Sequence, residues 1–148
     1  MKIFALIGLV LAALTVSLAA PANVAGQDNP NVIFNRCTQR LQQISERTTN
    51  AQREIVRECV PVIEELLMNG EFLRARAVAE RCINRINEVT EDGLRALHAT
   101  CEECIQALRR LEAYALANRL EQICQEHAAR IRNSRERAVN RIRSLFGD

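Results

Sequence analysis

The segment "ECVPVIEELLMNGEFLRARAVAERC", residues Glu58–Cys82, contains the strongest turn signal in this chain of 148 residues. Asn69-Gly70 lies at its centre, and glycine readily adopts the left-handed conformation that ends a helix. Apolar residues recur at steps of three and four on both sides of this dipeptide, as in amphipathic helices. Cys59 and Cys82 are equidistant from the turn. The segment therefore predicts two helices joined by a tight connection.

The same spacing continues over residues 31–146, and no segment alternates with period two, so the predicted fold class is all-α. The stripe positions are Ile33, Cys37, Leu41, Ile44, Ala51, Ile55, Cys59, Val62, Leu66, Val78, Cys82, Ile86, Val89, Leu97, Cys101, Cys104, Leu108, Leu111, Ile131, Ala138, Ile142 and Leu145. Weaker breaks near residues 49, 92, 113 and 133 divide the chain into about five or six helices of roughly twenty residues. We predict a disulfide-stapled antiparallel bundle of these helices, with Pro61 either kinking the second or beginning a new one.

The N-terminal residues have the pattern of a secretory signal peptide. Lys2 precedes an apolar run, Ile3–Leu18, which small residues follow. Cleavage is expected after residue 19, with residue 26 as the alternative; residues 20–30 would form a flexible segment and residues 31–148 a single helical domain. An apolar run of about sixteen residues is short for a membrane span. We expect a secreted, extracellular protein without a transmembrane segment.

Six cysteines follow this segment: Cys37, Cys59, Cys82, Cys101, Cys104 and Cys124. An even number in an oxidising compartment predicts three disulfides. Bridges in a helical hairpin join residues equidistant from its turn, and two pairing schemes meet this condition in part. A sequential scheme pairs Cys37 with Cys59, Cys82 with Cys101, and Cys104 with Cys124. A second scheme pairs Cys59 with Cys82 and Cys37 with Cys104 around Asn69-Gly70, leaving Cys101 for Cys124. We favour the first, because the second needs helices of about thirty-five residues, which are unusual in a small domain.

Cys101, Cys104, Cys124 and His127 have the spacing of zinc ligands. Against a metal site, the surrounding sequence is a strong helix former, and zinc would leave three unpaired cysteines. Against a redox couple, two glutamates between Cys101 and Cys104 disfavour a thiolate. We therefore expect structural disulfides and no metal, with His98 and His127 as packing residues.

The composition excludes several functions. Lys2 is the only lysine, so a lysine Schiff base is excluded once the signal is removed. A formal net charge of +2 argues against a dedicated nucleic-acid binder. Aromatic residues beyond the signal, which would be needed to stack bases, are few: Phe34, Phe72, Tyr114 and Phe146. No catalytic triad is recognisable, so we expect a non-enzymatic protein without a cofactor.

The last segment, "HAARIRNSRERAVNRIRSLFGD", residues 127–148, combines an apolar stripe with arginines. Arg130, Arg137 and Arg141 flank the stripe on one side, and Arg132 and Arg143 flank it on the other. Such arginines can bind an acidic protein surface, a sulfated glycan or an anionic lipid. The alternative is that they pair with glutamates on neighbouring helices.

The signal peptide, the helical character of residues 31–146 and the spacing of the six cysteines resemble the small secreted helical proteins of arthropods, in particular the TsetseEP-type group. Insect odorant-binding proteins carry Cys-x₃-Cys and Cys-x₈-Cys, whereas this chain has Cys101-x₂-Cys104. The expected function is that of a secreted interaction protein that binds an extracellular macromolecule. The alternative is a carrier that holds a small lipophilic ligand between its helices.

Overall fold

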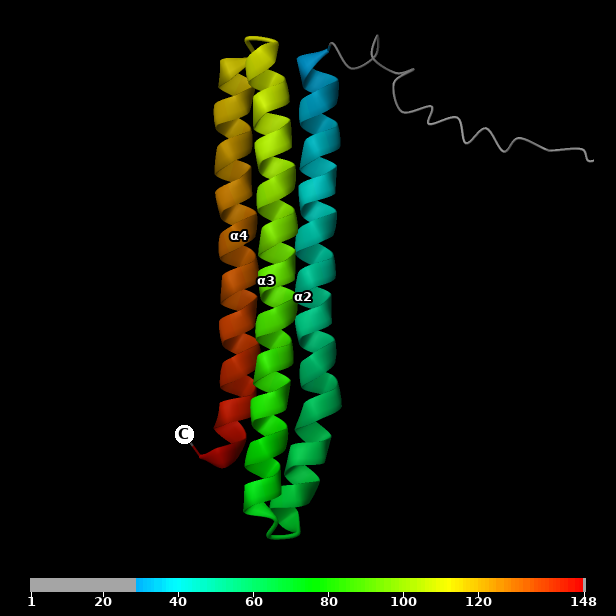
Figure 1. Ribbon diagram of the computed structural model, residues 1–148, viewed down its shortest axis with the longest axis vertical. Helices are drawn as coiled ribbons and strands as arrows, with labels where there is room; N and C mark the ends of the chain where they lie inside the picture. Colours follow the sequence, from blue (N-terminus) through cyan, green and yellow to red (C-terminus); the bar gives the residue numbers. More distant parts are fainter. Residues whose placement is uncertain (1–28, 148) are drawn as a thin grey trace, which may run out of the picture.

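The computed structural model describes residues 29–147, which form three long helices lying side by side in antiparallel order (Figure 1). Helix α2 spans Pro30–Met68, α3 spans Phe72–Arg110, and α4 spans Tyr114–Arg143 and continues into the short 3₁₀ helix η2, Ser144–Phe146. The all-α prediction is confirmed, and the described residues contain no strand. The predicted number of five or six helices is wrong. The predicted signal peptide and most of the predicted flexible segment lie outside the described residues.

The α2–α3 connection has the conformation that the Asn69-Gly70 signal predicts. Gly70 has a φ of 74°, in the left-handed region. Its N–H donates to the Leu67 carbonyl at 3.1 Å, and the Glu71 N–H donates to the Leu66 carbonyl at 2.8 Å. These two bonds satisfy carbonyls at the end of α2, which otherwise lack helical partners.

The α3–α4 connection uses the same hydrogen-bond pattern without a glycine. The Glu112 N–H donates to the Arg109 carbonyl and the Ala113 N–H to the Leu108 carbonyl, both at 2.9 Å. Glu112 takes the left-handed position, with a φ of 57°. The break predicted near residue 113 is therefore confirmed, although its left-handed residue carries a side chain that disfavours this conformation.

The other three predicted breaks lie inside continuous helices. Their polar residues occupy inward-facing positions at steps of three and four rather than turns. Eight polar residues are buried: Ser45, Thr48, Thr49, Gln52, Thr90, Thr100, His127 and Ser134. We call this set the polar layer. Along the helices, all of these residues except Thr100 and His127 lie between two apolar clusters, one built around Leu41, Leu97 and Leu120 and the other around Ile63 and Ile86.

Gly93, beside the break predicted near residue 92, lies in the middle of α3. A Cβ atom added to Gly93 would overlap the side chain of Thr48 on α2. The glycine is thus required for close approach of the two helices, and not for a turn. Pro61 likewise neither ends α2 nor begins a new helix. The buried apolar stripe of α2 is shifted by one residue from the predicted position: Val62 is 47% exposed, whereas Ile63 is fully buried.

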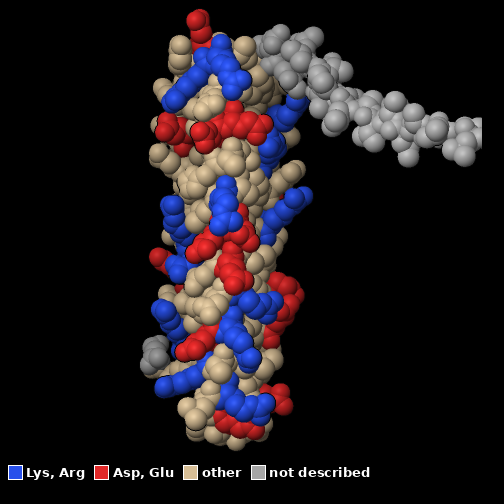
Figure 2. Space-filling model, in the orientation of Figure 1, with Lys and Arg blue, Asp and Glu red and all other residues tan. Residues whose placement is uncertain are grey.

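Arginines and acidic residues interleave along the surface of the bundle, with apolar and neutral residues between them (Figure 2). The basic side chains among the described residues are all arginines, because the chain's only lysine is Lys2. This interleaving agrees with the near-balanced net charge.

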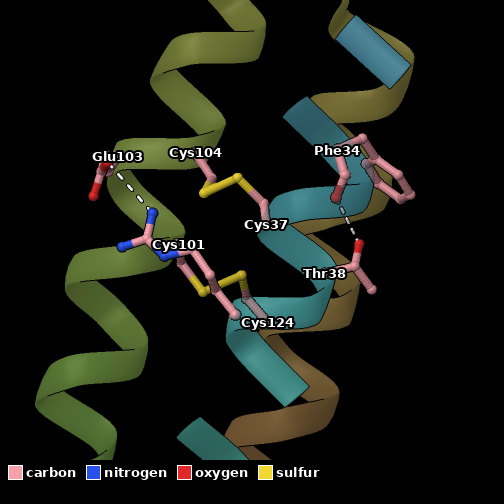
Figure 3. The surroundings of a disulfide bond; sticks show 8 residues. Phe34, Cys37, Thr38, Cys101, Glu103, Cys104 and Cys124 are labelled. Carbon is pink, nitrogen blue, oxygen red and sulfur yellow. Dashed lines mark hydrogen bonds and ion pairs between the residues drawn. A yellow bond between two sulfur atoms is a disulfide. The ribbon is translucent and has the colours of Figure 1, made fainter. Parts of the chain in front are cut away.

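The six cysteines form three disulfides: Cys37–Cys104, Cys59–Cys82 and Cys101–Cys124. The sequential pairing is wrong, and the second scheme is the one observed. The physical reason is helix length: α2 and α3 each have 39 residues, so residues far from the Gly70 turn still face each other. Cys101 and Cys104, one turn apart on α3, link it to α4 and α2 respectively (Figure 3). Every disulfide therefore involves α3.

Candidate functional site

The five arginines predicted to bind a partner are exposed on α4. Residues 128–147 contain six arginines and a single glutamate. Within residues 29–147, none of the five lies in an ion pair with a carboxylate; these are Arg130, Arg132, Arg137, Arg141 and Arg143. The alternative interpretation, that they pair with glutamates on neighbouring helices, has no ion pair to support it among the described residues. Their charge is available to a partner.

The two sides predicted for these arginines correspond to two different neighbouring helices. Arg137 and Arg141 border a groove of about 410 Å³ between α4 and α2, and Arg53 and Arg57 border it from α2. The other residues that line it are Val56, Ser134 and Ala138. We call this feature the arginine groove. It brings four guanidinium groups around a shallow floor of small and apolar side chains.

Little negative charge offsets these four arginines. Arg57 forms an exposed ion pair with Glu54 at 3.4 Å, a kind of contact that contributes about 0–1 kcal/mol. Arg53 donates to the Asn50 side chain at 3.4 Å. No acidic residue is among those that line the groove. The positive potential of the groove is thus largely uncompensated, which favours an anionic ligand.

The arrangement suits an extended anion. Residues four apart on a helix are separated by about 6 Å along its axis, so each wall presents two guanidiniums at this spacing. Guanidinium groups bind carboxylates and sulfates through paired hydrogen bonds, which the ammonium group of lysine cannot form. The groove can therefore bind several anionic groups of one ligand at once.

The grooves on the α3 side of α4 have mixed charge. Arg132 lines a groove of about 590 Å³ between α3 and α4, together with Glu102 and Glu121. Arg143 lines a smaller hollow that also contains Glu80. Arg130 lies close enough to the buried His127 to affect its pKa. Of the predicted residues, the structure brings only Arg137 and Arg141 into an acid-free groove.

Sequence reasoning missed Arg53 and Arg57. Their spacing of four residues places both on one face of a helix, and this signal was available. The sequence does not show, however, that this part of α2 lies beside the second half of α4. That adjacency depends on helices of 39 and 30 residues running without a break.

The four residues with zinc-ligand spacing are not available as a metal site. Cys101 is bonded to Cys124, and Cys104 to Cys37, so none of these sulfurs is a thiolate. His127 is buried, and its Nδ1 has no hydrogen-bond partner. Burial lowers the pKa of His127 below 6.5, and the nearby Arg130 lowers it further. Within residues 29–147, no cluster of three His, Cys, Asp or Glu side chains is arranged to bind a metal ion.

None of the helices in the described part of the chain is both long and apolar enough to span a bilayer. The chain matches no family model, no curated protein and no solved structure. The resemblance to TsetseEP-type proteins therefore stays a prediction.

Proposed function

We propose that the protein is a secreted, non-enzymatic interaction protein that binds an acidic extracellular macromolecule through the arginine groove. The observation that carries this proposal is the acid-free lining of that groove, with Arg53 and Arg57 on one wall and Arg137 and Arg141 on the other. Three disulfides, which are typical of secreted proteins, support the extracellular location.

The scaffold supports binding by holding the two walls in place. A helix of 39 residues is about 58 Å long. Disulfides bond both α2 and α4 to α3, the helix that lies between them in the sequence. A rigid surface loses little conformational entropy when it binds, so more of the interaction energy appears as affinity. The binding surface thus exists before the partner arrives.

Immobilised heparin, a sulfated polyanion, tests the proposal directly. We expect the double variant Arg137→Gln/Arg141→Gln to elute at lower salt than the unmodified protein. The slope of log K against log salt should fall by roughly 0.7–0.9 for each lost contact, as for other polyanions.

The matched control is Arg81→Gln/Arg110→Gln, which removes the same charge from exposed positions outside the groove. Its elution should stay close to that of the unmodified protein. An equal shift for both double variants would contradict a specific groove, because net charge alone would then explain retention.

The alternative, a carrier of a lipophilic molecule held between the helices, has less support. The interior is occupied by fully buried side chains, among them Leu41, Ile63, Leu108 and Ile131. A ligand there would have to displace well-packed groups, which is costly in a dense core. A native mass spectrum of protein isolated from its source tests this alternative, since a carrier would retain its lipid.

A further inference from the structure

Apolar side chains are exposed at the end of the bundle that contains the α2–α3 turn. Met68 is 87% exposed, Phe72 61% and Leu73 84%. Helix α4 has 30 residues against 39 in α2 and α3, and the helical hairpin of α2 and α3 extends beyond the end of α4 (Figure 1). The first turn of α3 therefore lacks the cover that α4 gives to the rest of the bundle.

This end of the molecule is hollowed between α3 and the end of α4. One hollow, of about 380 Å³, is lined by Phe72, Leu73 and Arg76 of α3 and by Leu67, Leu145 and Phe146. A second hollow, of about 240 Å³, lies next to it and shares Arg76 and Phe146. We call the two together the end groove. The volume of the first hollow falls within the range of small-molecule sites, about 300–1,000 Å³, and the second hollow extends it.

The first hollow of the end groove is lined mainly by apolar side chains, whereas the second adds Arg143 and Glu80 to Arg76. Phe72, Leu73 and Leu145 line the first hollow, Arg143 lines the second, and Arg76 lines both. Neither arginine forms an ion pair within residues 29–147, although Glu80 lies in the same hollow. An apolar surface that leads to two unpaired guanidiniums is complementary to a molecule with an alkyl tail and an anionic head.

We propose that the end groove binds a single-chain anionic amphiphile of the fatty-acid class. The alkyl tail would cover Phe72, Leu73 and Leu145, and the carboxylate would lie near Arg76 and Arg143. Tail burial supplies affinity in proportion to the apolar area removed from water, and the guanidiniums select the anionic head group. This proposal is independent of the arginine groove, which lies between a different pair of helices.

Two other occupants fit the observations less well. Three exposed apolar side chains form a patch of a few hundred Å², whereas a stable dimer buries about 800 Å² on each partner. An anionic membrane surface would also approach Glu64, Glu65 and Glu71 around the turn, and these carboxylates would be repelled. A single amphiphile in the hollow avoids both difficulties.

Titration of the ¹⁵N-labelled protein with decanoate, well below its micelle concentration, tests the proposal. We expect chemical-shift changes at the amides of residues 72–76 and 142–146. Decan-1-ol, with the same tail and no charge, should bind about five- to tenfold more weakly. The double variant Arg76→Gln/Arg143→Gln should weaken the binding of decanoate by a similar factor and leave the binding of decan-1-ol unchanged.

A substitution among the residues that would cover the alkyl tail should have a different effect from one at the two arginines. Leu73→Ser, at a position too exposed to affect folding, should weaken both ligands several-fold. The matched control Arg137→Gln/Arg141→Gln, in the arginine groove, should bind decanoate like the unmodified protein, so the two proposals can fail separately. The absence of decanoate binding, or equal binding of acid and alcohol, would overturn the proposal. The proposal would also be overturned if the protein bound phosphatidylglycerol vesicles but did not respond to monomeric decanoate.

Discussion

Replacing Gly93 by alanine should destabilise this protein, although the same change in an exposed helix stabilises it by about 1 kcal/mol. The added Cβ would overlap Oγ1 and Cγ2 of Thr48 and would lie 2.9 Å from its Cβ. Rotation of the Thr48 side chain relieves the first two contacts but not the third, because the backbone fixes the position of a Cβ. Helices α2 and α3 would have to separate, and overpacking of this kind costs about 1–3 kcal/mol. After the gain in helix propensity of about 1 kcal/mol, we expect a net loss of up to about 2 kcal/mol.

The companion change Thr48→Gly removes all three contacts. By itself it should cost about 1–2 kcal/mol, through lower helix propensity and loss of the hydrogen bond that Thr48 donates to the Ile44 carbonyl at 2.8 Å. In its presence Gly93→Ala meets no obstacle and should become stabilising by about 1 kcal/mol. The effect of the same substitution is therefore expected to reverse in sign, with a coupling energy of about 1–3 kcal/mol.

Urea unfolding of the four proteins, followed by circular dichroism with the disulfides intact, measures this coupling. Slopes that agree among the four would show that the free energies of unfolding are comparable. The reasoning would be refuted if Gly93→Ala changed the stability equally in both backgrounds, or if it stabilised the unmodified protein. Either result would mean that α2 and α3 do not touch at this point.

Glu112→Gly should raise the free energy of unfolding by about 1 kcal/mol, because it removes a side chain from the left-handed position with a φ of 57°. Thermal unfolding should show no such increase in stability for Glu112→Ala, which keeps a Cβ. Burial first, and a neighbouring arginine second, lower the pKa of His127 below 6.5. As the pH is lowered, the imidazole is therefore protonated in the unfolded chain at a higher pH than in the folded one. Stability should accordingly fall as the pH drops below about 6.5, and urea midpoints between pH 7 and 5 should change less in His127→Asn than in the unmodified protein. In a tryptic digest without reductant, the peptide with Cys59 should be linked to the peptide with Cys82, and mass spectrometry that found any other partner would contradict the bundle.

The helical class was predictable because hydrophobic periodicity is a local property. Steps of three and four residues, with no alternation, identify helices whatever their neighbours are. Asn69-Gly70 was also predictable, since the left-handed preference of glycine acts within one residue. The turn at Glu112 is marked only by a pause in the apolar stripe.

The number of helices was not predictable by the same reasoning. Thr48, Gln52, Thr90 and Ser134 are polar. In a prediction from hydrophobic periodicity, polar residues at these positions indicate breaks between helices. In the bundle they continue the inward face: the Gln52 side chain donates to the Thr90 hydroxyl at 2.8 Å and to the Ile131 carbonyl at 3.3 Å. Partners that satisfy a buried polar group come from other helices, and sequence periodicity does not identify them.

The candidate site divides in the same way. The excess of arginine in α4 could be recognised in the sequence, because residues 128–147 contain six arginines and one glutamate, but the sequence left open whether glutamates of neighbouring helices pair with them. The groove itself required Arg53 and Arg57, which are distant along the chain and adjacent only after folding.

By itself, the sequence determined that the described chain is helical, that it turns at Gly70, and that α4 carries an excess of arginine. These properties depend on backbone preferences and on residues within a turn or two of one another. Only the tertiary structure decided that α2 and α3 run unbroken for 39 residues, which cysteines pair, and which arginines face each other. The physical reason is that these outcomes depend on contacts between distant segments, where packing against another helix outweighs local turn propensity.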